Sequence, residues 1–385
     1  MSKADSGGVY AGRLAGAELS GSTLSTKSTV LLVALLLGST TINYIDRQVL
    51  SVLAPILRDE FWLSNSGYAA ILNAFMITYA AAISLAGWVI DRLGVVLGLS
   101  LAVAWEAAAS MLTSLSRGAL SLACFRSLLA VGESGAWPSF AKAVPIWIPK
   151  NWRPLVMGIC SSGSSLGATI APILVVFLTR QFGWRGAFLA TGSLGFLWVV
   201  TFQVFRFLHP QIRATEQELS RSARKTSWPA LLRYRQTWAV FVARFLSDPL
   251  WYFYIFWIPE FLTRERGLQL KEIGALAWIP FVAADIAFFS TGWLALTLQR
   301  RGWSVHRTRK TIMLVGALLS GIAVAAPFAH SLFWTMASLT VGVFFWTSWN
   351  ITVQTLPGDI FPARAVGSVY GIGACGAMTG VTLSI

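Results

Sequence analysis

The stretch Asn43-Tyr44-Ile45-Asp46-Arg47 lies inside a run of apolar residues that extends from Thr29 to Leu57. A run of this length lets an α-helix cross the hydrocarbon core of a bilayer, which takes about 20 apolar residues. An aspartate and an arginine in the middle of such a helix are costly unless they face the protein interior or a wet cavity. We therefore expect a helical membrane protein with a polar site on this helix.

The composition separates this chain from soluble proteins. Of its 385 residues, 55% are hydrophobic and only 12% are charged, which is about half the charged fraction of a soluble domain. The net charge is +14, but the basic residues lie in short loops between apolar runs, as the positive-inside bias requires. A nucleic-acid footprint needs a clustered basic surface instead. We therefore expect the lipid bilayer, and not nucleic acid, as a partner.

The cysteines and the N-terminus indicate neither a metal nor a cleaved signal. Cys124, Cys160 and Cys375 fall within apolar runs, and their spacing matches no metal site. Residues Met1 to Thr26 are polar and lack the apolar core of a signal peptide. We expect no cofactor, and a first spanning helix that directs insertion itself.

Apolar runs bounded by turn residues or charges predict about eleven spanning helices. The distribution of Lys and Arg between the loops places the N-terminus in the cytoplasm. The predicted segments fall near residues 29–57, 66–90, 95–116, 119–149, 154–180, 184–206, 238–263, 270–298, 311–329, 331–356 and 365–385.

Two parts of the chain resemble each other. The pair Gly87-Trp88 near the end of the second segment recurs as Gly292-Trp293 near the end of the eighth, 205 residues later. Two such units would need about 410 residues, and the chain stops inside an apolar segment at Ile385. We expect an all-α protein of two six-helix halves with its last helix missing. The expected parts are a cytoplasmic tail at 1–28, an N-terminal half at 29–206, a cytoplasmic linker at 207–237 and a truncated C-terminal half of about five helices at 238–385.

Four charges lie within the spanning segments of the first half: Asp46, Arg47, Arg126 and Glu133. Tyr44 and Arg47 are three residues apart and share a helical face, whereas Asp46 points about 100° away. Arg126 and Glu133, seven residues apart, share a face as well. Two cations and two acids predict an anion site held by arginine, with acids that take up protons. The alternative is that the charges only pair to hold helices together.

Other polar residues and motifs have more ordinary interpretations. Glu106 either faces a cavity or pairs with a neighbour, and we favour the structural role; Arg244 and Asp248 are typical of gating or capping residues. Two enzyme-like spellings, Gly163 to Gly167 and Gly371 to Gly376, lie in spanning helices without the preceding strand that their chemistry needs. They indicate small-residue packing surfaces, and we expect no enzyme.

At this point the pattern resembles a known family. Gly87-x3-Asp91-Arg92-x-Gly94 is similar to the loop signature of the major facilitator superfamily, although Val95 to Gly98 replace its basic tail. This resemblance implies the major facilitator fold. Within this superfamily, four stretches resemble the anion:cation symporter family: Asn43 to Arg47, Arg126 to Pro138, Gly183 to Phe188 and Asp359 to Pro362. Three further stretches resemble the hexuronate transporter branch of that family: Arg244 to Trp251, Phe256 to Pro259 and Trp278 to Asp285.

The resemblance also implies roles for individual residues. Arg47 and Arg126 would contact the carboxylate of a sugar acid, Asp46 and Glu133 would carry protons, and Arg126 would also pair with Glu133. The remaining implied roles are substrate hydrogen bonds from Tyr44, Tyr79, Trp251, Tyr254 and Asn350, and gating by Gly87, Asp91, Arg92 and Gly94.

We therefore expect a proton-coupled symporter that imports a hexuronate, such as glucuronate or galacturonate, by alternating access. It would be a monomer in a bacterial inner membrane, with an organic anion and protons as its partners. The alternatives are a symporter or exchanger for another organic anion (aldonate, tartrate or an aromatic acid), a membrane sensor that binds sugar acids without moving them, and an inactive chain that lacks its last helix.

Overall fold

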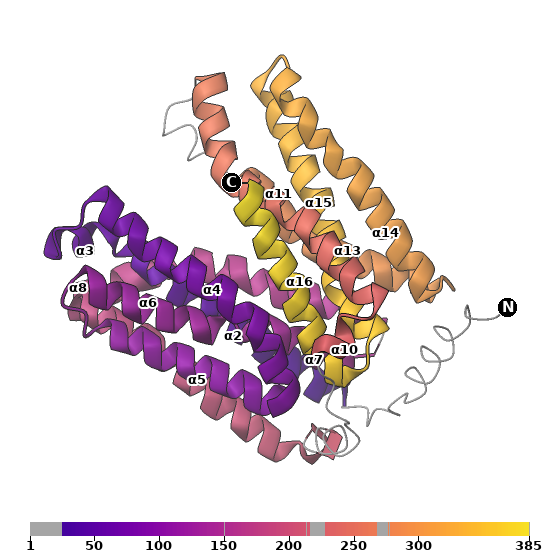
Figure 1. Cartoon of the computed structure of the whole chain (residues 1–385), viewed down its shortest axis with the longest axis horizontal. Coiled ribbons are helices and arrows are strands. Elements are labelled where there is room, and N and C mark those ends of the chain that lie inside the picture. The colour runs from indigo at the N-terminus through magenta and orange to yellow at the C-terminus, as the bar shows by residue number, and fades with distance from the viewer. Residues whose placement is uncertain are drawn as a thin grey trace. The chain divides into compact units, whose positions relative to one another are not determined.

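The structure, a computed structural model, describes residues 25–149, 151–212, 214–215, 228–267, 276 and 278–384. Most of the tail predicted at 1–28, much of the linker predicted at 207–237 and the predicted start of the eighth segment lie outside the described residues. Within the described ranges all regular structure is helical (Figure 1).

The six segments predicted in the first half coincide with helices. The first is divided by Pro55, which fits the opening turn of a new helix because its missing N–H costs no bond there. The fourth is divided near Ser134, and the fifth and sixth are two helices that meet at Gly183 (φ 67°) and share the label α8. The helices are α2 (Thr26–Val52), α3 (Ala54–Glu60), α4 (Asn65–Leu93), α5 (Val95–Thr113), α6 (Ala119–Glu133), α7 (Ala136–Trp147) and α8 (Arg153–Leu208).

The second half continues in the same way. The ninth predicted segment begins as α-helix and ends as a 3-10 helix that contains Pro327. The elements are α10 (Trp228–Leu231), α11 (Arg235–Arg266), α13 (Ile279–Arg300), α14 (Val305–Ser320), η1 (Gly321–Phe328), α15 (Leu332–Ile360) and α16 (Ala363–Ser384).

Length and composition fit a membrane environment. Among the described residues, seven helices are long and apolar enough to cross a bilayer, and one of them, α8, has 56 residues, about twice the length that one crossing takes. Large apolar side chains such as Ile77, Leu101, Ile173 and Leu197 are exposed on these helices. Soluble proteins rarely expose so much apolar surface to water, whereas the lipid tails of a bilayer are themselves apolar. The chain is a multi-pass membrane protein.

The chain forms two compact units. Unit 1 comprises Met1–Ile148, Gly163–Gln236 and Pro357–Ile372, and unit 2 comprises Pro149–Ser162, Thr237–Leu356 and Gly373–Ile385. The long helix α8 and the last helix α16 therefore each contribute to both units.

The two enzyme-like spellings serve helix packing, as predicted. A Cβ at Gly167 of α8 would lie 2.4 Å from the carbonyl oxygen of Thr41 on α2. A Cβ at Gly376 of α16 would lie 2.5 Å from the carbonyl oxygen of Phe241 on α11. Because no side chain fits at either position, these glycines let the helix backbones meet.

The Gly-Trp repeat also has a structural counterpart. A Cβ at Gly87 would overlap the carbonyl of Gly367 on α16 within unit 1, and one at Gly292 would lie 2.5 Å from Cα of Leu155 on α8 within unit 2. Downstream, Gly94 (φ 82°) and Gly302 (φ 87°) follow the ends of α4 and α13 in the left-handed region that favours glycine. The two copies thus perform the same local task.

Candidate functional site

Helix α2 places the charged side chains of Asp46 and Arg47 in the interior of unit 1. Its N-terminus is capped by Ser25, whose hydroxyl accepts from the Ser28 amide. Asp46 is buried, with 1% exposure, and the Arg47 side chain keeps 25%. Both charges therefore avoid lipid, as the cost of an intramembrane charge requires.

Arg47 pairs with Glu133 and joins α2 to α6. Its Nε donates to Glu133 Oε2 at 2.8 Å and its Nη2 donates to the same oxygen at 2.5 Å. Glu133 is fully buried. The second carboxylate oxygen, Oε1, has no hydrogen-bond donor within the described ranges. Both donors thus serve one oxygen and leave the other unpaired.

Aromatic rings surround the same guanidinium. The Arg47 Cζ lies 4.9 Å from the ring centroid of Tyr44, 5.3 Å from that of Phe75 and 5.0 Å from that of Tyr79. Phe75 and Tyr79 stack on each other with 6.0 Å between their centroids. All three distances are within the range of cation–π attraction, so the rings position the arginine head group.

Arg126 approaches α2 from α6. Its Nη1 donates to the Asp46 carbonyl at 3.2 Å and its Nη2 to the Arg47 carbonyl at 3.1 Å. Its Nε has no acceptor in the described part of the chain. The predicted pairing of Arg126 with Glu133 is therefore not the one observed, because Arg47 takes that carboxylate. Arg126 therefore retains Nε as a donor for another acceptor.

Two further carboxyl groups lie in the same interior. Asp46 Oδ1 accepts from the Ser110 hydroxyl at 2.8 Å, and Glu106 Oε2 accepts from the Asn43 amide at 3.2 Å. The other oxygen of each carboxyl group is buried without a donor among the residues described. Neutral groups thus supply the hydrogen bonds recorded for both acids.

These five residues, Asp46, Arg47, Glu106, Arg126 and Glu133, are named the charged cluster. It holds three acids and two bases, all on α2, α5 and α6. Full ionisation would leave one negative charge without a compensating cation in a buried site, which is costly. One bound proton removes that charge. The cluster can therefore bind an anion through arginine and exchange protons through its carboxyl groups.

The residues predicted from the second half gather in unit 2. Asn350 donates through Nδ2 to Asp248 Oδ1 at 3.2 Å, and its Oδ1 accepts from Gln354 Nε2 at 2.6 Å. Arg244 and Asp248, one helical turn apart on α11, form a buried ion pair at 2.9 Å. The amide predicted to meet substrate is thus held by an ion pair.

Trp251 and Tyr254 lie in an apolar cluster of unit 2. Trp251 stacks on Trp346 with 5.3 Å between centroids and meets Phe281 edge to face. Tyr254 is buried beside Ile258. The structure thus brings six of the predicted binding and proton residues together in unit 1 and three in unit 2, where Trp251 and Tyr254 also pack the core.

The residues of the predicted gating motif lie at the end of α4. Asp91 accepts from the Gly367 amide at 3.1 Å and the Ser368 amide at 2.6 Å, near the start of α16. Lys142 of α7 pairs with Asp91 at 3.1 Å. Arg92 stacks on Trp88, with its Cζ 3.8 Å from the ring centroid. Lys142 thus supplies a cation beside the motif, whose basic tail the sequence lacks.

Sequence reasoning missed several neighbours of the charged cluster. Phe75 has a simple signal, since it precedes Tyr79 by four residues and so shares its helical face. Ser110 likewise follows Glu106 by one turn. Asn43 belongs to the stretch Asn43 to Arg47, but the sequence assigned it no role. Helical spacing from the predicted site residue Tyr79 would have found Phe75, and spacing from Glu106 would have found Ser110.

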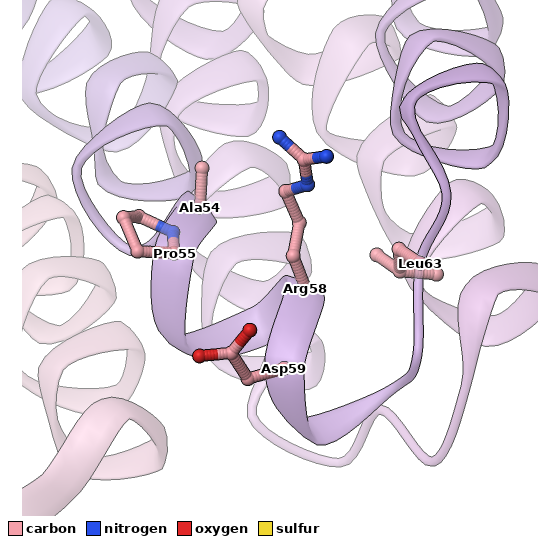
Figure 2. Close-up of a pocket in the computed structure, with 5 residues that line it drawn as sticks. All are labelled: Ala54, Pro55, Arg58, Asp59 and Leu63. Carbon is pink, nitrogen blue, oxygen red and sulfur yellow. The ribbon is translucent and has the colours of Figure 1, made fainter.

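A pocket of about 320 Å³ lies elsewhere, at α3, where Ala54, Pro55, Arg58, Asp59 and Leu63 line it (Figure 2). Figure 2 shows Arg58 and Asp59 projecting from the helix. The Arg58 guanidinium is already hydrogen-bonded to Asn65 and lies over the ring of Tyr68. None of the lining residues belongs to the charged cluster, so we assign this pocket no role.

Comparison with known proteins identifies the family. The model of the Major Facilitator Superfamily matches residues 36–384. The hexuronate transporter of Escherichia coli K12 is 31% identical over 369 residues, which cover 91% of this chain and 85% of that protein. The galacturonate transporter of Dickeya chrysanthemi is 30% identical over 306 residues, covering 75% and 88%.

A solved structure shares the fold. The proton:xylose symporter XylE, bound to 6-bromo-6-deoxy-D-glucose, superposes with a TM-score of 0.68 at 15% identity, covering 94% of this chain and 88% of that one. At 15% sequence identity, this similarity shows the fold alone. The fold predicted from the sequence is thus confirmed, and this chain belongs to the Major Facilitator Superfamily of membrane transporters.

Proposed function

We propose that this protein is a secondary active transporter that imports a hexuronate, such as glucuronate or galacturonate, together with protons by alternating access. It would work as a monomer in a bacterial inner membrane with its N-terminus in the cytoplasm. The similarity to the hexuronate and galacturonate transporters supports the substrate class. The observation that carries the proposal is the surplus of buried acids over bases in the charged cluster.

The carboxylate of the substrate would bind to the two arginines. Arg126 donates to backbone carbonyls and retains its Nε. Arg47 is partly exposed and bonds to a single oxygen of Glu133. A guanidinium matches a carboxylate with two parallel hydrogen bonds. The hydroxyl groups of Tyr44 and Tyr79, whose rings border Arg47, would then meet the sugar.

Proton coupling follows from charge. A uronate brings another negative charge to a cluster that already has more acids than bases, so its binding favours protonation of Asp46 or Glu133. By linkage, protonation favours uronate binding to the same degree. Arg47 would exchange Glu133 for the substrate, and Glu133 would become neutral as its cation leaves. Substrate and proton would therefore enter together.

The remaining predicted residues would recognise the sugar hydroxyls and control access. Asn350 keeps a second amide hydrogen for this purpose, because one amide bears two; Trp251 and Tyr254 would contribute a ring and a hydroxyl. The motif Gly87, Asp91, Arg92 and Gly94 would release and remake the Asp91 contacts with α16 during the transport cycle.

The test is uptake of radiolabelled galacturonate into membrane vesicles with an imposed pH gradient. Asp46→Asn and Glu133→Gln should each lose gradient-driven accumulation but retain exchange of internal for external galacturonate, which needs no net proton movement. Glu60→Gln serves as a matched control, because Glu60 pairs with Arg185 outside the charged cluster. If the double variant still accumulates galacturonate in response to the gradient, the proton roles are wrong.

The same assay separates the alternatives. A panel of aldonates, tartrate and aromatic acids identifies another organic anion as the substrate if one of them displaces galacturonate. An exchanger accumulates label only when the vesicles are preloaded. A sensor is indicated if galacturonate stabilises the purified protein against heat, as a bound ligand does by mass action, but no uptake follows.

A further inference from the structure

Glu106 is a buried acid that the mechanism above counts in the charge of the cluster but to which it gives no proton-carrying role. It lies in the middle of α5 and is 2% exposed. Its Oε2 accepts from Asn43 at 3.2 Å, and its Oε1 has no donor within the described residues. A neutral amide thus supplies the one hydrogen bond recorded for this carboxyl group.

Glu106 lies directly against the helix that carries Glu133. A Cβ at Gly132 would lie 2.6 Å from the Glu106 backbone nitrogen and 2.9 Å from its Cα. The backbones of α5 and α6 are therefore in contact beside Glu133, the next residue along α6. Glu106 interacts electrostatically with both Glu133 and Asp46. Three acids are thus concentrated around one helix crossing.

Within the described residues, the cations nearby form their hydrogen bonds with groups other than Glu106. Of the groups on helices packed against α5, Arg47 of α2 bonds to Glu133, and Arg126 of α6 bonds to backbone carbonyls. Lys142 of α7 pairs with Asp91. On α4 the ionisable groups besides Asp91 and Arg92 are tyrosines, on α2 the remaining ones are Asp46, Tyr44 and Lys27, and residues 187–205 of α8 contain none.

We propose that Glu106 is a third proton-binding residue of the charged cluster, held in place by Asn43, and that it exchanges its proton with Glu133. This inference rests on the proposed function for its role in transport. As Arg47 moves from Glu133 to the substrate, the O–H bond of Glu106 breaks and an O–H bond forms on Glu133. The proton moves from one carboxyl oxygen to the other, and the carboxylate left on Glu106 then takes up the proton that enters with the substrate.

A purely structural role explains Glu106 less well. A glutamine would accept the same hydrogen bond from Asn43 without the desolvation cost of an ionisable group. An acid in this position costs stability, and this cost indicates that its proton has a function. Intramembrane acids that face the protein interior are typical of proton relays.

The first experiment needs no substrate. Infrared difference spectra of the reconstituted full chain, recorded as the pH changes, report the C=O stretch of protonated carboxyl groups. Glu106→Gln should remove one carboxyl contribution from the wild-type band, whereas Glu60→Gln should leave the buried-carboxyl band unchanged. An unaltered band in Glu106→Gln would show that Glu106 carries no proton, and would overturn the inference even if transport is as proposed.

The second experiment links Glu106 to transport. We expect gradient-driven accumulation of galacturonate by Glu106→Gln to fall about tenfold, the effect of a one-unit change in proton affinity, while exchange persists. Glu106→Asp should restore most of the accumulation and its pH profile, because it keeps a carboxyl group. If Glu106→Gln fails to fold, the double variant Glu106→Asp/Asn43→Ala replaces it. This double variant should shift the pH profile, because it lacks the amide that donates to the carboxyl group. A pH profile identical to wild type in the folded glutamine variant overturns the proton transfer. A wild-type protein that moves no protons with galacturonate instead overturns the proposed function, and the infrared result still stands.

Discussion

The charged cluster of unit 1 and the network around Asp248 in unit 2 handle buried charge in opposite ways. In unit 2, Asp248 is saturated: Arg244 donates to Oδ2 at 3.1 and 2.9 Å, and Ser247 and Asn350 donate to Oδ1 at 3.1 and 3.2 Å. One cation balances one acid in this network. In the charged cluster, three acids share two cations and each leaves one oxygen without a donor among the described residues.

The difference originates in sequence spacing. Arg244 and Asp248 are four residues apart on α11, so they meet on the surface of one helix. Asp46 and Arg47 are adjacent, so they diverge by about 100° and each must find its partner on another helix. A pair within one helix can be satisfied locally, whereas a pair split between helices responds to how those helices are arranged. The charged cluster of unit 1 therefore depends on the arrangement of several helices, whereas the Arg244–Asp248 pair of unit 2 forms on one helix.

The largest expected effect concerns stability in unit 2. Removing one partner, as in Asp248→Leu, leaves a buried charge and should cost about 3–5 kcal/mol. The double variant Arg244→Met/Asp248→Leu should recover most of this loss, because a balanced pair can be replaced by apolar residues. Thermal unfolding in detergent measures both. A double variant no more stable than the single one would contradict the view that Arg244 and Asp248 mainly balance each other's charge.

The next effect concerns the arginines. Arg126→Lys should weaken galacturonate binding about 100-fold, because lysine cannot reproduce the guanidinium fork. Arg244→Lys should weaken it by no more than about fivefold, since its charge and its partner Asp248 remain. Equilibrium binding to the purified protein provides the comparison. Equal losses in the two variants would remove Arg126 from the substrate site.

A smaller effect tests the helix contact beside the cluster. Gly132→Ala places a Cβ 2.6 Å from the Glu106 backbone and should cost about 1–3 kcal/mol through overpacking. Gly118→Ala, at the residue that precedes α6, is the control, because its Cβ meets nothing within 4 Å. Thermal unfolding of both variants gives the result, and equal melting temperatures would mean that α5 and α6 are not in contact at Gly132.

The smallest effect concerns the aromatic residues of unit 2. Tyr254→Phe keeps the buried ring and removes only the hydroxyl that is proposed to meet the sugar, so we expect galacturonate affinity to fall about fivefold, the loss of one neutral hydrogen bond. Binding measurements with galacturonate check this. An affinity equal to that of the wild type would remove the hydroxyl from the sugar site.

Much of the fold could be predicted from the sequence because lipid imposes a strong pattern. Apolar runs predicted the helices of the described residues, from α2 to α16. The repeated Gly-Trp pair marked two close helix contacts, one at Gly87 and one at Gly292. The division between α6 and α7 was not predicted, although the polar and glycine residues Gly132 to Gly135 interrupt the apolar run at that point. The contribution of α8 and α16 to both units depends on tertiary contacts that no local pattern encodes.

The candidate site was predictable in its residues but not in its pairing. The cost of intramembrane charge identified Asp46, Arg47, Arg126 and Glu133. Two arginines at similar depth can each reach Glu133, and only the packing of α2 on α6 decides that Arg47 does. The closeness of Glu106 to Asp46 and Glu133 was not predictable, because it arises from the packing of two other helices, which its own segment does not reveal.

The most direct measurement records proton and galacturonate movement together in proteoliposomes under identical conditions. Addition of galacturonate to the wild-type protein should make the external solution more alkaline as both species enter. Asp46→Asn/Glu133→Gln should abolish this signal, and Glu60→Gln should preserve it. Proton movement that persists with galacturonate in the double acid variant would contradict the central claim that the charged cluster of unit 1 couples the proton to the sugar acid.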